Sequence, residues 1–210
     1  MLNIAFFSSS SLTLPLLDKL NTDFRVKLVV TNPDKQIGRK QILTPSALKT
    51  WAIKNKIEFL TPISLKTPAI NETMEQLSVD LAVVIDYGLL IPKTVFTIPK
   101  LKTINIHFSL LPKYRGPNPN SAVLLNGEKR TGISFVLIDE GFDTGDILAQ
   151  KEVKILPTET AGELHQRLYR ETEKIIAYII DSWAGSKLGN NYNRYNDYSN
   201  YIQLFLPPKK

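Results

Sequence analysis

Leu81-Ala82-Val83-Val84-Ile85 is a run of five apolar residues near the middle of the chain. Its length and its β-branched valines are typical of a short strand that lies inside the core. Strands buried on both faces occur mainly in parallel sheets that are covered by helices. The run therefore predicts an α/β fold.

Strand and helix patterns alternate on the amino-terminal side of this run. Predicted strands cover residues 2–7, 24–30 and 57–60, and predicted helices begin near Pro15 and cover residues 46–54 and 70–77. Strands joined through helices form right-handed crossovers, which produce a mainly parallel sheet. We therefore expect parallel strands in the first half of the chain.

The pattern changes after residue 107. Residues 131–138 and 147–155 are predicted strands joined by the short loop Asp139 to Asp146, which favours an antiparallel pair. The capping-box pattern Thr160 to Glu163 then begins a long amphipathic helix, expected to end near Ala184-Gly185. The sheet should therefore be mixed, with this helix covering it.

Composition limits the classes of protein and of site. The 210 residues, 43% of them hydrophobic, are enough for one globular domain, which we expect at residues 1–188, followed by a loose Asn- and Tyr-rich tail at 189–210. No cysteine and only two histidines are present, so we expect no metal. Since no apolar run could cross a bilayer, we expect a cytoplasmic protein without a membrane partner.

The charge allows a polyanionic partner without requiring one. The formal net charge is +6 and the sequence pI is about 9.4. Many basic proteins bind no nucleic acid, and we expect no DNA partner.

Two short motifs carry candidate catalytic side chains. In Asn105-Ile106-His107 the alternation of an extended strand places the amide and the imidazole on one face. Asp143 lies in the glycine-rich string Asp139-Glu140-Gly141-Phe142-Asp143-Thr144-Gly145-Asp146, where a flexible turn can bring a carboxylate to a ligand. Taken separately, each motif is more often a structural hydrogen-bonding pair or an ordinary turn.

The motifs together resemble a known family. The strings Ser109-Leu110-Leu111-Pro112-Lys113-Tyr114-Arg115-Gly116 and Asp139 to Leu148 resemble the folate-dependent formyltransferases, and within them the members that act on methionyl-tRNA and on sugar nucleotides. The resemblance covers roughly residues 1 to 185. It implies a Rossmann-like, three-layer formyltransferase fold with a mostly parallel, mixed central sheet.

The resemblance also implies the site and its ligands. Asn105, His107 and Asp143 would be catalytic, and 10-formyltetrahydrofolate would be the formyl donor. Chemistry agrees, because an amide and a protonated imidazole can stabilise an oxyanion and a carboxylate can move the amine proton. The residues expected to bind the donor are Tyr87, Gly88, Leu89, Leu90, Ile138, Asp139, Glu140 and Gly141.

The segment from Asn32 to Ser46 bears on the choice of amine. It is long and basic for a connection between strand and helix, although a solvated surface loop would look the same. It resembles the loop with which family members enter the acceptor arm of initiator methionyl-tRNA. We expect Arg39 to contact tRNA, with Lys35 and Lys40 neutralising phosphates. The other residues assigned to substrate binding are Ser109, Leu110, Leu111, Pro112 and Arg115.

Several departures from the family pattern leave alternatives open. Ser8 to Ser11, Asp86 and Pro117 to Asn120 replace the residues usual at these positions. The tRNA-specific members also carry a carboxyl-terminal β-barrel, which a tail of roughly 25 residues cannot build, so we expect a truncated form. The resemblance implies formyl transfer from 10-formyltetrahydrofolate to the amino group of initiator methionyl-tRNA. The alternatives are formylation of a nucleotide-linked amino sugar and binding of folate or RNA without catalysis.

Overall fold

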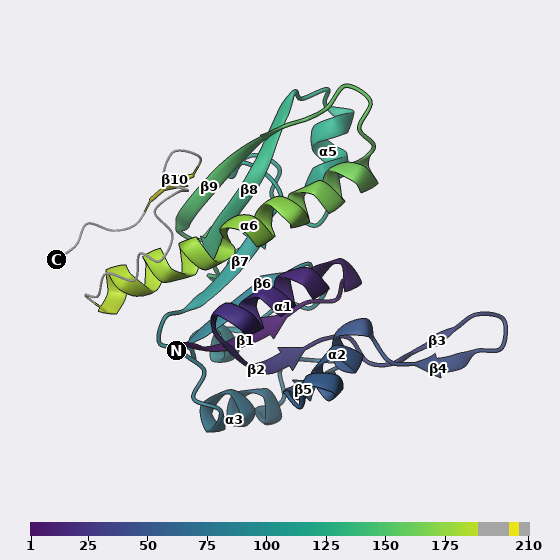
Figure 1. The fold of residues 1–210 in the computed structure, drawn as a ribbon, viewed down its shortest axis with the longest axis vertical. Helices are drawn as coiled ribbons and strands as arrows, with labels where there is room; N and C mark the ends of the chain where they lie inside the picture. Colours follow the sequence, from purple (N-terminus) through teal and green to yellow (C-terminus); the bar gives the residue numbers. More distant parts are fainter. Residues whose placement is uncertain (189–201, 206–210) are drawn as a thin grey trace. The chain divides into compact units, whose positions relative to one another are not determined.

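The computed structural model describes residues 1–188 and 202–205 (Figure 1). The chain divides into two compact units, Met1–Ile104 (unit 1) and Asn105–Lys210 (unit 2). We describe each unit by itself.

The strands of unit 1 form the predicted parallel arrangement. They are β1 (Asn3–Phe7), β2 (Arg25–Val30), β5 (Glu58–Leu60) and β6 (Leu81–Ile85), in the order β6-β1-β2-β5. β1 pairs in parallel with both β2 and β6, and β2 pairs in parallel with β5. All five residues of β6 are buried, which confirms the prediction for the central apolar run. Because β2 and β6 flank β1 on opposite sides, the strand order reverses at β1.

Helices connect these strands. The elements are η1 (Ser11–Thr13), α1 (Leu14–Asp23), α2 (Ala47–Asn55), α3 (Pro68–Gln76) and α4 (Lys93–Phe96), of which the short α4 was not predicted. Pro15 lies in the first turn of α1, and Ser46 caps α2 by accepting a hydrogen bond from Lys49 N at 3.1 Å. The Ser8 to Ser11 turn serves as a cap too, since Ser10 Oγ accepts from Leu12 N.

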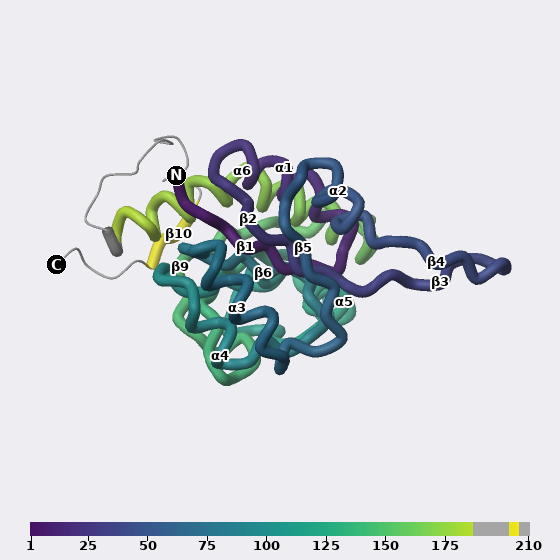
Figure 2. Tube along the Cα trace, turned by 90° about the horizontal axis from the view of Figure 1, so that it is seen from below, coloured from purple at the N-terminus to yellow at the C-terminus, as the bar shows by residue number. Residues whose placement is uncertain are grey.

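The basic segment between β2 and α2 is a hairpin rather than a plain loop. β3 (Lys35–Ile37) and β4 (Ile42–Thr44) pair antiparallel around the turn of residues 38–41. Gly38 has a φ of +73°, a left-handed conformation that glycine adopts without strain, and Gln41 N donates to Gly38 O at 3.1 Å. The hairpin extends away from the rest of unit 1 in both views (Figures 1 and 2).

The strands of unit 2 follow the order β10-β9-β8-β7. β7 (Thr103–His107) ends in the predicted Asn-x-His motif, and β8 (Arg130–Leu137) and β9 (Ile147–Lys154) form the predicted antiparallel pair. The strands of unit 1 pair in parallel, and β8, β9 and β10 pair antiparallel. The prediction of a mixed sheet is therefore confirmed. Short β10 (Gln203–Leu204) pairs antiparallel with β9.

Two helices accompany these strands, α5 (Pro119–Leu125), which was not predicted, and α6 (Ala161–Leu188). The predicted capping box is present, since Thr160 N donates to Glu163 Oε2 at 2.9 Å and Glu163 N donates to Thr160 Oγ1 at 3.3 Å. The apolar face of α6 is buried against β8 and β9, as expected (Figure 1). The helix runs on to Leu188, so the predicted end near Gly185 was wrong; glycine lowers helix propensity by only about 1 kcal/mol, which neighbouring turns and packing can offset.

Most of the Asn- and Tyr-rich tail lies outside the described residues. Of positions 189–210, the structure describes 202–205, where Ile202 is buried and Phe205 N donates to Leu148 O at 2.8 Å. In the described parts of the chain, no helix is long and apolar enough to cross a bilayer.

Candidate active site

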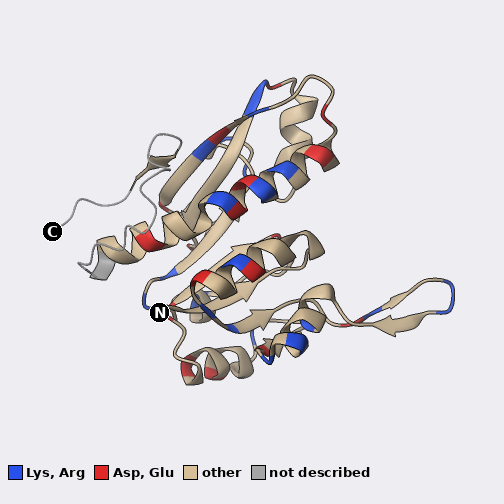
Figure 3. Ribbon diagram, viewed as in Figure 1, with Lys and Arg blue, Asp and Glu red and all other residues tan. Residues whose placement is uncertain are grey.

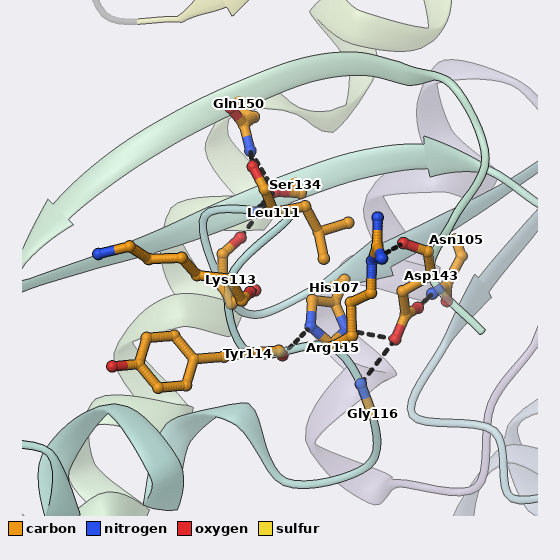
Figure 4. Close-up of polar contacts among 11 residues, drawn as sticks. Asn105, His107, Leu111, Lys113, Tyr114, Arg115, Gly116, Ser134, Asp143 and Gln150 are labelled. Atoms are coloured by element: carbon orange, nitrogen blue, oxygen red, sulfur yellow. Dashed lines mark hydrogen bonds and ion pairs between the residues drawn. The ribbon is translucent and has the colours of Figure 1, made fainter.

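β7 presents Asn105 and His107 on one face, as the strand period requires (Figure 4). Ile104 and Ile106 alternate with them and are buried in the core. The His107 side chain is 7% exposed, whereas Asn105 is half-buried. The end of β7 therefore offers an amide and an imidazole side by side, near solvent but largely enclosed.

Asp143 joins these two side chains. It lies in the loop between β8 and β9, and its Oδ1 accepts a hydrogen bond from Asn105 Nδ2 at 3.0 Å. Its Oδ2 lies 3.5 Å from His107 Nδ1, the geometry of an ion pair when the ring is protonated. Asp143 has a φ of +52°, a left-handed conformation that aspartate tolerates better than most residues. The structure thus brings together the three residues predicted to be catalytic.

The segment Ser109–Gly116, which we name the catalytic loop, completes the cluster with backbone groups. His107 Nε2 lies 2.8 Å from Tyr114 O, and Gly116 N donates to Asp143 Oδ2 at 3.0 Å. Arg115 Nε donates to Asp143 O at 3.1 Å. Tyr114 and Gly116 have φ values of +57° and +100°, so the loop turns sharply where it meets the site. The imidazole and the carboxylate are both held by this loop (Figure 4).

These contacts determine how the His107 ring carries its hydrogen. A carbonyl oxygen can only accept, so Nε2 must donate to Tyr114 O. Nδ1 then faces the Asp143 carboxylate, and a second ring proton on Nδ1 would form an ion pair with it. The Asn105 amide has two hydrogens, one of which is used by Asp143. The site therefore contains one amide N–H and one imidazole next to a fixed carboxylate.

The loop that carries Asp143 is held by its own side chains. Asp139 Oδ1 accepts from Gly141 N at 3.0 Å and from Thr144 Oγ1 at 2.8 Å. A Cβ atom on Gly145 would lie 1.9 Å from Leu137 O, so only glycine fits there. Residues 139–142 of this loop are exposed.

The residues predicted for substrate binding in the catalytic loop differ in exposure. Pro112 and Arg115 are exposed and Leu110 is half-buried. Ser109 and Leu111 are 0% and 5% exposed, and Ser109 Oγ donates to Lys113 O at 2.7 Å. The substrate-binding role of these five residues stays a prediction.

The predicted residues Tyr87 to Leu90 follow β6 in unit 1. Here the turns after β1, β2 and β6 meet: Ser9 N donates to Asp86 O at 2.9 Å and Ser9 Oγ donates to Asn32 Oδ1 at 3.0 Å. Carboxyl ends of parallel strands where the strand order reverses are the usual ligand site of such sheets. Burial raises the pKa of Tyr87 to about 12, and its hydroxyl has no hydrogen-bond partner among the described residues.

Arg39 and Lys40 lie in the turn of the β3–β4 hairpin, and Lys35 lies in β3 (Figure 3). All three are exposed, as are the apolar side chains of Ile37, Ile42 and Leu43. Lys49 Nζ contacts both carboxylate oxygens of Asp34 at 2.8 Å, which fixes the base of the hairpin to α2. An exposed basic tip on an anchored base suits a polyanionic partner.

Sequence patterns did not identify Tyr114 and Gly116 as parts of the site, because both act through the backbone. A turn signal exists at Gly116, but no side-chain pattern marks Tyr114 O as an acceptor for His107. Within residues 1–188 and 202–205, no cluster of three or more His, Cys, Asp or Glu side chains is arranged to hold a metal ion.

Comparison with known proteins places this chain in a family. The family model described as formyl transferase matches residues 2–180, so the chain belongs to the formyl transferase family. Among its relatives, the methionyl-tRNA formyltransferase of Clostridioides difficile (strain 630) is 35% identical over 199 residues, which is 93% of this chain. That of Caldicellulosiruptor saccharolyticus is 39% identical over 85% of this chain. The chain spans only 64% and 61% of these two relatives.

Solved structures confirm the fold. The phosphoribosylglycinamide formyltransferase of Bacillus halodurans matches with a TM-score of 0.74 at 20% identity, covering 93% of this chain and 100% of that one. The corresponding enzyme of Streptococcus pneumoniae TIGR4 matches with a TM-score of 0.72 at 18% identity, covering 87% of this chain and 98% of that one. These likenesses show the Rossmann-like formyltransferase fold.

Proposed function

We propose that this chain transfers a formyl group from 10-formyltetrahydrofolate to the amino group of initiator methionyl-tRNA. The observation that carries the proposal is the Asp143 carboxylate, which contacts Asn105 and His107 together at the end of β7. The choice of acceptor rests on the methionyl-tRNA formyltransferases that are similar over most of the chain.

The proposed reaction needs an oxyanion stabilised and a proton moved. The amine nitrogen attacks the formyl carbon, and the carbonyl oxygen becomes negatively charged. The second hydrogen of the Asn105 amide donates to that oxygen, and a protonated His107 is the second donor through Nδ1, while its Nε2 stays bonded to Tyr114 O. A well-placed donor of this kind is worth about 3 to 4 kcal/mol.

Asp143 serves the proton transfer. Its carboxylate stabilises positive charge on the His107 ring and, through water, accepts the proton that the attacking amine must lose. The new C–N bond to the acceptor forms, the bond between the formyl carbon and the donor nitrogen breaks, and the proton passes to that leaving nitrogen. No group other than the two substrates is consumed.

The formyl donor supplies an activated one-carbon unit on a folate nitrogen. We propose Ile138, Asp139, Glu140 and Gly141 in unit 2 for its binding, and Tyr87, Gly88, Leu89 and Leu90 stay a separate prediction for unit 1 taken by itself. Residues 139–141 are exposed beside Asp143, where their peptide groups can bond to a polar ring system.

The β3–β4 hairpin would bind the acceptor. Arg39 and Lys40 in its turn and Lys35 in β3 would neutralise phosphates of the tRNA, which makes binding dependent on salt. The relatives are longer than this chain. The proposed tRNA contact therefore concerns only the hairpin residues named above.

The test is formyl transfer from 10-formyltetrahydrofolate to charged initiator methionyl-tRNA, run beside a panel of nucleotide-linked amino sugars. Formyl-methionyl-tRNA as the product supports the proposal. Turnover of a sugar without tRNA product would move the acceptor to that class. No transfer to any acceptor would favour the non-catalytic alternative.

A further inference from the structure

Two polar side chains on neighbouring strands bond to the base of the catalytic loop. Ser134 in β8 and Gln150 in β9 are paired residues of the antiparallel ladder. Ser134 Oγ donates to Ser109 O at 2.6 Å and accepts from Leu111 N at 3.1 Å (Figure 4). Gln150 Nε2 donates to Ser134 Oγ at 2.8 Å and to Leu111 O at 2.9 Å.

The Ser134 hydroxyl at the centre of this network is buried and fully bonded. Ser134 is 0% exposed, and its hydroxyl uses its one hydrogen and both acceptor positions. A buried polar network with every member satisfied favours one arrangement over its competitors, because any shift leaves groups unpaired. Gly132, two residues before Ser134, has no room for a Cβ, which would lie 2.4 Å from Leu110 Cδ2. The loop base therefore lies directly on β8.

The fixed base leads to the catalytic side chains. Ser109 Oγ donates to Lys113 O, which ties the base of the loop to its far end. The next residue, Tyr114, accepts from His107, and Gly116 donates to Asp143. A shift at the base would thus move the two backbone groups that orient the imidazole and the carboxylate.

We propose that Ser134 and Gln150 are positioning residues for formyl transfer, which fix the catalytic loop so that Tyr114 O and Gly116 N orient His107 and Asp143. They touch neither substrate nor reacting atoms. The link to catalysis rests on the proposed function, whereas the orientation of His107 can be measured without any substrate.

The experiment is NMR of the full chain labelled with ¹⁵N-histidine, which contains only His107 and His165. Ser134→Ala and Gln150→Leu are compared with wild type and with Thr131→Val. Thr131 is a matched control, because it lies buried in the same strand and its hydroxyl has no hydrogen-bond partner among the described residues. We expect both variants to shift the ring signals of His107 and to speed exchange of its Nε2 hydrogen, while the signals of His165 stay unchanged.

The kinetic measurements separate a positioning role from a general loss of structure. Both variants should lower kcat for formyl transfer by about 10- to 100-fold with little change in KM, and Thr131→Val should not. Folded variants with unchanged His107 signals would overturn the proposal. If Ser134→Ala does not fold, the Gln150→Leu variant tests the proposal, because Gln150 is only half-buried. A wild type inactive on every amine would reject the proposed function, and the spectra would still decide whether the loop orients His107.

Discussion

At the scale of single residues, Asp143 is the centre of the site. Its two carboxylate oxygens contact Asn105 Nδ2, His107 Nδ1 and Gly116 N, and its backbone oxygen accepts from Arg115. A positive φ in a residue other than glycine costs free energy and is retained mainly where the surroundings require it. The backbone conformation at Asp143 orients its carboxylate toward Asn105 and His107.

Asp143→Asn tests the charge of that carboxylate. Asparagine has the same shape and tolerates the left-handed backbone, so the fold should persist. Loss of the negative charge removes the proposed proton acceptor and the charged partner of the His107 ring, and kcat should fall by about 10²- to 10⁴-fold. Steady-state kinetics beside circular dichroism measure both effects. A folded variant with wild-type kcat would contradict the role of Asp143.

Gly145 and Gly162 differ in the room that surrounds them. Gly145→Ala should lower activity strongly and destabilise the chain, because the new Cβ would meet Leu137 O and displace the loop that carries Asp143. Gly162→Ala is the matched control: nothing lies within 4 Å of its Cβ, and it should raise stability by about 0.4 to 1 kcal/mol. Thermal unfolding and formyl transfer of the two variants check the contrast.

At the scale of elements, α6 is fastened to the end of β9 by Glu159 and Arg167. Arg167 donates to Glu159 at 2.6 and 2.7 Å and to Lys154 O at 2.6 Å. The hydrogen bond from Arg167 holds the pKa of the Glu159 carboxyl below its usual value of 4.5. A lowered pKa in the folded state stabilises the fold above the unfolded pKa, and this contribution is lost as pH falls through the folded pKa.

Glu159→Gln should therefore lower Tm by about 5 °C at pH 7. The difference in Tm between wild type and Glu159→Gln should narrow as pH falls below the usual glutamate pKa of 4.5, since the wild-type Glu159 then loses its charge as well. Calorimetric unfolding from pH 7 to pH 3 measures this. A difference in Tm that stays constant across that pH range would show that the charge of Glu159 does not contribute to stability.

The β3–β4 hairpin is the element proposed to bind tRNA. Arg39→Ala should raise KM for methionyl-tRNA about tenfold, leave kcat nearly unchanged, and reduce the salt dependence of binding by about one phosphate contact. Arg39→Lys is the control, since it keeps the charge at the exposed turn. Kinetics at several salt concentrations check both variants. An unchanged KM in Arg39→Ala would remove the hairpin from tRNA binding.

At the scale of the whole molecule, patterns of several residues were predicted well and single backbone groups were not. The buried run Leu81–Ile85 and the pair of strands around residues 139–146 follow from hydrophobic periodicity, which the core enforces. The hairpin at residues 35–44 escaped prediction because its apolar residues are exposed and pack on no core. Tyr114 O and the network of Ser134 depend on where a loop lies in space, which no local pattern records.

The role of the cluster is tested by the rate of formyl transfer to methionyl-tRNA by wild type beside Asn105→Ala, His107→Asn and Asp143→Asn. We predict transfer by the wild-type chain and a fall of at least about 100-fold in each folded variant. Wild-type rates in all three folded variants would show that the cluster at the end of β7 does not carry the reaction.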